Sequence, residues 1–156
     1  MPAVQFVVEG GRPLSGSIRP SGNKNAALPI VAAALVSPSP VHLENVPRIR
    51  DIETLVELIR SVGASVEWVG QNALDIHAKD LRPADLNPTL CAKIRASILL
   101  AAPLLARCGQ VTLPPPGGDV IGRRRLDTHF LALEQLGAKF THGKQIEMRV
   151  SGFTSP

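Results

Sequence analysis

The stretch NAALPIVAAAL, residues 25–35, decides the fold because a matching stretch, RASILLAAPLL, follows at residues 95–105. Both are rich in alanine and leucine and predict a helix. At the same spacing, VHLENVP at 41–47 falls on VTLPPPG at 111–117, and both predict a strand. The chain therefore contains an internal repeat, and its architecture follows from how two similar units pack together.

The second unit carries an insertion. VGA at 62–64 matches LGA at 136–138, and these two stretches lie four residues further apart than the other matching pairs. The extra residues fall in LPPPGGDVIGRRRLD, residues 113–127, which combines prolines, the glycine pair 117–118, Asp119 and three consecutive arginines. Two interpretations are open: a solvated basic surface turn, or a mobile loop that handles an anion.

Each unit is predicted to run helix, strand, helix, strand, strand. In the first unit these elements are predicted at 24–36, 40–47, 50–64, 65–70 and 72–79. In the second unit they are predicted at 91–109, 110–116, 126–138, 139–143 and 145–152. Two further strands are predicted before the repeat, at 4–11 and 16–20, and Ser21 or Asn23 is expected to cap the first helix.

One such unit cannot bury both the apolar face of its sheet and those of its helices, so neighbouring units must share a core. The predicted fold class is α/β, or more fully α+β, built from repeated βαβαββ units, two of which are present.

The composition favours an anionic ligand. The 156 residues are 44% hydrophobic and 19% charged, as is typical of a globular domain. A net charge of +4 and a pI near 9.6 favour negatively charged partners. Aromatic residues make up only 3% and tyrosine is absent, so a stacking platform for single-stranded nucleic acid is not expected.

Neither a metal site nor a disulfide framework is predicted. Cys91 and Cys108 lie in an apolar helix-like stretch without a CxxC pair, and the histidines show no ligand spacing. No signal-like segment opens the chain, and the apolar run 96–106 is too short to cross a bilayer. A cytoplasmic, reducing setting without a membrane partner is therefore expected.

Four stretches carry a resemblance to a known family. They are GGRPLSGSIRPSGNKNAALPIVAAAL (10–35), LENVPRIRDIETL (43–55), KIRAS (93–97) and GGDVIGRRRLDTHFLALEQLGA (117–138). Together and in this order they resemble the UDP-N-acetylglucosamine enolpyruvyl transferases, over essentially the whole chain. The SGxKNAA and GxxIGxR patterns within them are specific.

The resemblance implies a longer protein of two domains, each made of three repeat units arranged as an inside-out α/β barrel, with the active site between them. Residues 1–20 would form a strand of the other domain, and 21–85 and 86–156 would be two of the three units. The third unit and the rest of the other domain would then be missing, so this segment alone should be inactive.

The resemblance also implies an activity. Enolpyruvyl would pass from phosphoenolpyruvate to the 3-hydroxyl of UDP-N-acetylglucosamine by addition and elimination, the first committed step of peptidoglycan precursor synthesis. Such chemistry needs cations on the phosphate and carboxylate, an acid for the vinyl carbon and a base for the hydroxyl. No organic cofactor and no metal are implied.

The resemblance assigns catalytic and substrate-binding roles to Lys24 and Asn25, at a helix start that already favours an anion. An exposed lysine near a cap is the plainer alternative. Arg95 falls on Asn25 in the repeat, so both units are expected to direct a polar side chain into one cleft. For Arg95 the alternative is an arginine whose stem lies along an apolar helix.

Further substrate-binding residues fall in and after the insertion. Arg124 matches a family arginine that binds phosphate, a task suited to a planar guanidinium, and is also expected to be catalytic. The segment that would bind uridine comprises Arg124, Arg125, Leu126, Asp127 and Thr128. Asp127 is also a candidate N-cap for the helix that follows.

Asp119 occupies the position where most family members carry a cysteine, and some members have an aspartate there. A carboxylic acid can protonate the vinyl carbon if it is itself protonated in the closed site. We therefore expect Asp119 to be catalytic, and we expect resistance to fosfomycin, the epoxide antibiotic that alkylates the family cysteine.

Two alternatives to the enzyme remain. The repeat could be a non-catalytic module that binds an anion or a UDP-sugar, or a basic nucleic-acid binder. The second is disfavoured because aromatic residues are scarce and no nucleic-acid-binding motif is present. Because the shared core would be incomplete in this segment alone, self-association through an exposed face is also expected.

Overall fold

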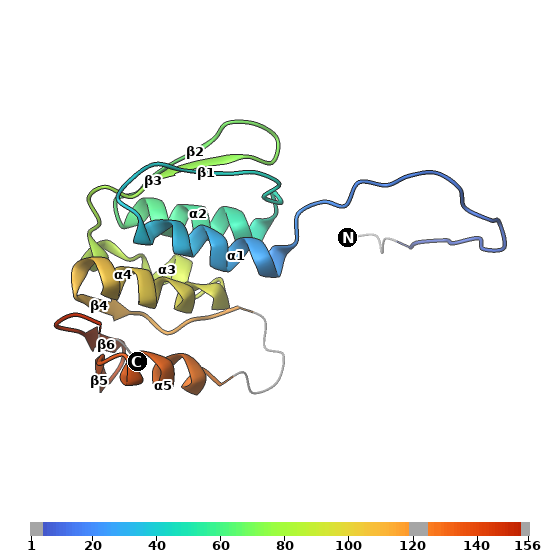
Figure 1. The fold of residues 1–156 in the computed structure, drawn as a ribbon. Coiled ribbons are helices and arrows are strands. Elements are labelled where there is room, and N and C mark those ends of the chain that lie inside the picture. Colours follow the sequence, from blue (N-terminus) through green and yellow to red (C-terminus); the bar gives the residue numbers. More distant parts are fainter. Residues whose placement is uncertain (1–4, 119–124, 154–156) are drawn as a thin grey trace.

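The computed structural model describes residues 5–118 and 125–153, with only the backbone of His142 (Figure 1). The first unit contains helix α1 (Lys24–Ala33), the 3₁₀ turn η1 (Ala34–Val36), strand β1 (Val41–Leu43), helix α2 (Arg50–Ser61), and strands β2 (Ser65–Trp68) and β3 (Leu74–His77). The connection holds η2 (Pro83–Asp85) and a short helix, α3 (Pro88–Cys91). The second unit contains η3 (Arg95–Leu100), α4 (Ala101–Cys108), β4 (Gln110–Leu113), α5 (Asp127–Gln135), β5 (Lys139–His142) and β6 (Ile146–Arg149).

The two units have the same sheet topology. The first sheet has the order β1-β3-β2 and the second β4-β6-β5, and every pairing is antiparallel. In each sheet the last strand of the unit lies in the centre, between the two earlier ones. The predicted class, an α/β fold of repeated units, is therefore confirmed.

A single hydrophobic core joins the two units. In α2 the buried side chains recur at helical spacing, as in Ile52, Leu55 and Ile59. The largest fully buried side chains come from both units: Leu35, Ile52, Leu55, Leu58, Ile59, Leu74, Ile76, Leu100, Leu104, Leu105, Leu113 and Met148. Neither unit buries its own apolar surface alone, as the repeat predicts.

The helices point the same way. In Figure 1, α1, α2 and α5, together with the η3–α4 segment, all begin at the right-hand end of the molecule. Pairwise contacts agree, because α1 packs on both α2 and η3, and η1, which follows α1, packs on α4. Their free N–H groups and positive dipole ends therefore gather at one end of the fold.

Arg107 ties the second unit to the first. Its guanidinium donates hydrogen bonds to the backbone carbonyl of Leu35 at 3.0 Å and to that of Lys79 at 2.9 Å. These carbonyls follow α1 and β3, respectively. One side chain of α4 thus holds two chain segments of the first unit.

The strands predicted at 4–11 and 16–20 are wrong for the described residues. From Gln5 to Gly22 the chain has no strand and extends away from the body of the molecule (Figure 1). Phe6, Val8 and Ile18 are each about nine-tenths exposed. A strand exists only in a hydrogen-bonded ladder, and no described segment pairs with this one.

The single helix predicted over 91–109 is also wrong, because the structure breaks it into α3, η3 and α4. The carbonyls of Cys91 and Ala92 accept hydrogen bonds from the N–H groups of Gly117 and Gly118, at 3.0 and 3.3 Å. Pro103 lies in the first turn of α4, directly after η3. Since proline has no N–H, it cannot donate an α-helical hydrogen bond to the carbonyl of residue 99. The remaining predicted helices and strands are present, with shorter bounds.

Among the described residues no helix is long and apolar enough to cross a membrane.

Candidate active site

Lys24 opens α1 and forms an ion pair with Asp51, the second residue of α2. Its Nζ donates to Asp51 Oδ2 at 2.8 Å, and both side chains are about half exposed. The ammonium therefore lies where two helix starts meet, within reach of solvent and of a ligand.

The start of α1 is fixed in two ways. The side chain of Asn23 caps the helix by accepting from the N–H of Ala26 at 3.1 Å, so of the two predicted caps Asn23 is confirmed and Ser21 is not used. Gly22 packs so closely on the segment after β1 that a Cβ would lie 1.8 Å from the carbonyl oxygen of Asn45. Asn25 follows Lys24 in the first turn and is exposed.

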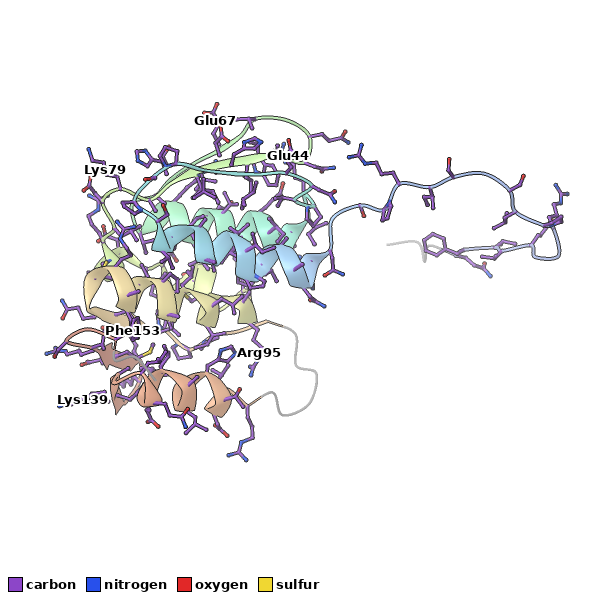
Figure 2. All side chains as sticks on the ribbon, viewed as in Figure 1. Glu44, Glu67, Lys79, Arg95, Lys139 and Phe153 are labelled. Carbon is purple, nitrogen blue, oxygen red and sulfur yellow. The ribbon has the colours of Figure 1, made fainter. Side chains whose placement is uncertain are left out.

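A similar close contact fixes the site in the second unit. A Cβ on Gly117 would lie 1.6 Å from the carbonyl oxygen of Ala92. Gly118 has a φ of +94°, and a Cβ there would lie 3.0 Å from the backbone nitrogen of Arg95. The start of the insertion therefore lies directly against Arg95, the first residue of η3 (Figure 2).

An open cleft of about 480 Å³ lies between these elements. Its walls come from the first turn of α2, the turn between α3 and η3, and Gly118, and they comprise Arg50, Asp51, Thr54, Ala92, Lys93, Ile94 and Gly118. Arg50 and Lys93 contribute positive charge that sequence reasoning did not assign to the site. Both lie beside predicted helix starts and within two stretches that carry the resemblance, LENVPRIRDIETL (43–55) and KIRAS (93–97).

This cleft is suited to a small anion. The carboxylate of Asp51, which lines the cleft, pairs with the ammonium of Lys24. Arg95 lies next to the cleft because its backbone packs against Gly118, which also lines it. The helix starts add backbone N–H donors at the same end of the fold. The structure thus brings Lys24, Asn25 and Arg95 to one end of the molecule, at or next to a cationic cleft.

The segment predicted to bind uridine is described from Arg125 onward. Arg125 Nε pairs with the carboxylate of Asp127, and both side chains are largely exposed. Leu126, not Asp127, is the N-cap residue of α5, so the predicted capping role of Asp127 is wrong. Asp127 is instead the first residue of α5, where its negative charge interacts favourably with the helix dipole. Thr128 beside it is exposed.

Asp119 and Arg124 lie outside the described residues. Their predicted roles as acid and phosphate ligand therefore stay predictions. The described flanks, Gly118 against Arg95 and Arg125 before α5, both lie at the end of the fold where the helices begin.

A second open cleft, of about 500 Å³, lies beside the second sheet between η2, β4 and β6. Its charged side chains, Arg82, Glu147 and Arg149, carry both signs, and none of the predicted site residues that the structure describes lines it. Both clefts are lined by two basic side chains and one acidic one, but only the cleft of about 480 Å³ lies at the helix starts, next to Lys24 and Arg95. Among residues 5–118 and 125–153 no cluster of histidine, cysteine or acidic side chains could hold a metal ion.

Comparison with known proteins identifies relatives over nearly the whole chain. The family described as EPSP synthase (3-phosphoshikimate 1-carboxyvinyltransferase) matches residues 8–154. A UDP-N-acetylglucosamine 1-carboxyvinyltransferase of Bradyrhizobium diazoefficiens is 72% identical over 149 residues, covering 96% of this chain and 35% of that protein. A protein of the same name from Treponema denticola is 49% identical over 135 residues, covering 86% of this chain and 32% of its own.

Solved structures agree on the fold. The enolpyruvyl transferase NikO from Streptomyces tendae superposes with a TM-score of 0.73 at 29% identity, covering 93% of this chain and 32% of its own. EPSP synthase from Acinetobacter baumannii gives a TM-score of 0.60 at 16% identity, covering 87% and 32%, and supports the fold alone. The chain spans about a third of the length of these relatives.

Proposed function

The chain belongs to the EPSP synthase family, and on that premise we propose that its protein transfers the carboxyvinyl group of phosphoenolpyruvate to the 3-hydroxyl of UDP-N-acetylglucosamine. The two relatives at 72% and 49% identity carry the name of that activity, which favours the UDP-sugar over the 3-phosphoshikimate of the family description. In a cell this step would commit the sugar to peptidoglycan precursor synthesis in the cytoplasm.

The observation that carries the proposal is the cationic cleft at the helix starts. Lys24 and Arg95 come from corresponding helices of the two units and lie at the same end of the fold. The reaction must hold a phosphate and a carboxylate together while charge develops on them. Lys24 and Arg95, on separate elements and next to a cleft that Arg50 and Lys93 line, provide such a setting.

The proposed reaction has two steps, an addition and an elimination. The acid protonates the terminal vinyl carbon of phosphoenolpyruvate, and the sugar oxygen adds to the neighbouring carbon as its proton passes to a base. The tetrahedral adduct then loses a proton from the new methyl group, the double bond re-forms, and inorganic phosphate leaves. Lys24 and Arg124 would stabilise the phosphate, and Asn25 would orient the reacting sugar.

We propose Asp119 as the acid of the first step. Its insertion begins at Gly118, directly against Arg95, which supports a place for it at the mouth of the cleft. Arg124, Arg125, Leu126, Asp127 and Thr128 are proposed to bind the nucleotide. Since Arg125 and Asp127 pair with each other, nucleotide binding would compete with that pair.

The domain division is part of the same proposal. Residues 1–20 would belong to a second domain, while 21–85 and 86–156 would be successive repeat units. The exposed apolar side chains of residues 5–22 support this division, since an apolar segment without a partner here is expected to pack elsewhere.

Variants of Asp119 test the proposed acid. In the complete product of the reading frame, Asp119→Asn should lower kcat by at least about 100-fold, since removing a general acid costs roughly 10²–10⁴ in rate. Asp119→Cys should stay active and become sensitive to fosfomycin, whereas the parent protein should not. Full activity of Asp119→Asn, or rapid inactivation of the parent by the epoxide, would contradict the assignment.

A further inference from the structure

The carboxylate of Asp51 has a contact that the proposed function does not use. Asp51 Oδ2 accepts a hydrogen bond from Lys24 Nζ at 2.8 Å, across 27 residues of sequence and between two different helices. An ion pair this exposed adds little to stability. We therefore expect this ion pair to matter mainly because it fixes the position of the Lys24 ammonium.

Another acid in the same turn of α2 has a separate partner. Glu53 accepts from Arg48 Nε at 3.2 Å, and the guanidinium of Arg48 lies 5.0 Å from the ring centroid of Trp68. Glu53 does not line the cleft, whereas Asp51 does. The two carboxylates therefore share a helix turn and its dipole, but only Asp51 contacts the proposed catalytic lysine.

We propose that Asp51 is a positioning residue for Lys24 in the carboxyvinyl transfer, an inference that rests on the proposed function. A lysine ammonium sits on a flexible four-carbon stem and carries three N–H donors. Asp51 occupies one donor and holds the nitrogen beside the cleft, which leaves the other two for the substrate phosphate. Because the lysine side chain is already ordered, substrate binding does not have to supply the free energy for ordering it.

The same contact has a cost for ground-state binding. The paired carboxylate of Asp51 offsets part of the positive charge that Lys24 would present to an anionic substrate, so it weakens anion binding. Asp51 should therefore raise the turnover rate while it weakens affinity for the free anion. A purely structural role would instead change kcat and stability together.

Asp51→Asn tests the proposal because the amide keeps the size of the side chain and removes its charge. In the complete product of the reading frame, kcat should fall at least tenfold, while KM for phosphoenolpyruvate should stay within threefold or fall. Asp51→Glu, which restores the charge, should recover part of the lost kcat. Glu53→Gln is the matched control from the same helix turn and should leave kcat within twofold.

Titration with inorganic phosphate tests the pairing without relying on turnover. Asp51→Asn should bind phosphate at least threefold more tightly than the parent. In a Lys24→Met background, the same substitution should change phosphate affinity by less than in the parent.

The outcomes separate the two proposals. A parent protein that transfers no carboxyvinyl group would overturn the proposed function, whereas the phosphate titration would still decide the pairing. Equal phosphate affinity of the parent and Asp51→Asn, or an equal effect of the substitution with and without Lys24, would overturn the role of Asp51. A loss of kcat in Glu53→Gln as large as in Asp51→Asn would overturn it as well.

Discussion

Gly117 is the residue whose size matters most to the site. Its N–H donates to the carbonyl of Cys91, and its Cα lies so near Ala92 that a Cβ would fall 1.6 Å from the carbonyl oxygen. This contact joins the insertion to the turn that precedes Arg95. The first unit makes the corresponding contact with Gly22 against Asn45, so each unit uses a glycine to bring two backbone segments together.

Gly117→Ala should destabilise the fold by about 2–4 kcal/mol, because backbone on both sides must move to admit the methyl group. The matched control is Gly70→Ala, where a Cβ would lie 3.9 Å from Ala73 and the φ is ordinary. Its stability should change by less than about 1 kcal/mol. Urea denaturation measures both, and equal midpoints for the two variants would contradict the close contact.

Cys91 is fully buried, and burial determines how its thiol titrates. Burial raises the pKa of its thiol to about 11, so only about 0.1% is thiolate at pH 8. We expect no labelling of Cys91 by iodoacetamide at pH 8 until the protein unfolds, as followed by mass spectrometry. The pKa of this thiol is higher in the folded protein than the ordinary value of 9.0 expected in the unfolded chain. The contribution of Cys91 to the free energy of unfolding is therefore fully present below pH 9 and is lost as the pH rises toward 11. Rapid labelling of Cys91 in the native protein would contradict this.

At the scale of single elements, Arg107 of α4 connects the second unit to the first through two hydrogen bonds. Replacing it with methionine keeps the apolar stem and removes the hydrogen bonds to Leu35 and Lys79. The free energy of unfolding should fall by about 1–3 kcal/mol, since bonds from charged donors to carbonyls lie in that range.

Arg82→Met is the control for Arg107→Met. Arg82 pairs with Asp85 on the surface at 3.3 Å, with 72% of its side chain exposed. Its loss should cost less than about 1 kcal/mol. If both variants unfold at the same denaturant concentration, Arg107 does not hold the units together as described.

The elements also show how far the sequence predicts the fold. Hydrophobic periodicity found α2 and the strands of both units because the spacing of apolar residues within one helix or strand is local in sequence. It joined α3, η3 and α4 into one helix because the break depends on Gly117 and Gly118, which lie about 25 residues further along the chain. It predicted strands before Gly22 from β-forming residues alone, although a strand also needs a neighbour.

The site shows the same limit. Lys24, Asn25 and Arg95 were predicted from motif and repeat, and the structure brings them to one end of the fold. Asp51 was missed because an acid in the first turn of a helix is common and needs no further explanation. Its contact with Lys24 crosses two helices, and such a contact is visible only once they are packed.

For the whole molecule, the repeat explains why the described chain leaves apolar surface exposed. On α1, Ile30 is 52% exposed, as is Val36 just after the helix, and both lie outside the shared core. Self-association of this segment stays a prediction, and so does the division into domains. Both follow from a unit that buries its faces only against neighbours.

The most direct test of the central claim is a carboxyvinyl transfer assay on the complete product of the reading frame that encodes this chain. With phosphoenolpyruvate and UDP-N-acetylglucosamine together, we predict release of inorganic phosphate and an equal amount of the UDP-sugar carrying one carboxyvinyl group, detected by mass spectrometry. Lys24→Met should lower the rate by at least about 100-fold. Phosphate release that does not require the UDP-sugar, or no transfer despite a folded protein that binds it, would contradict the account.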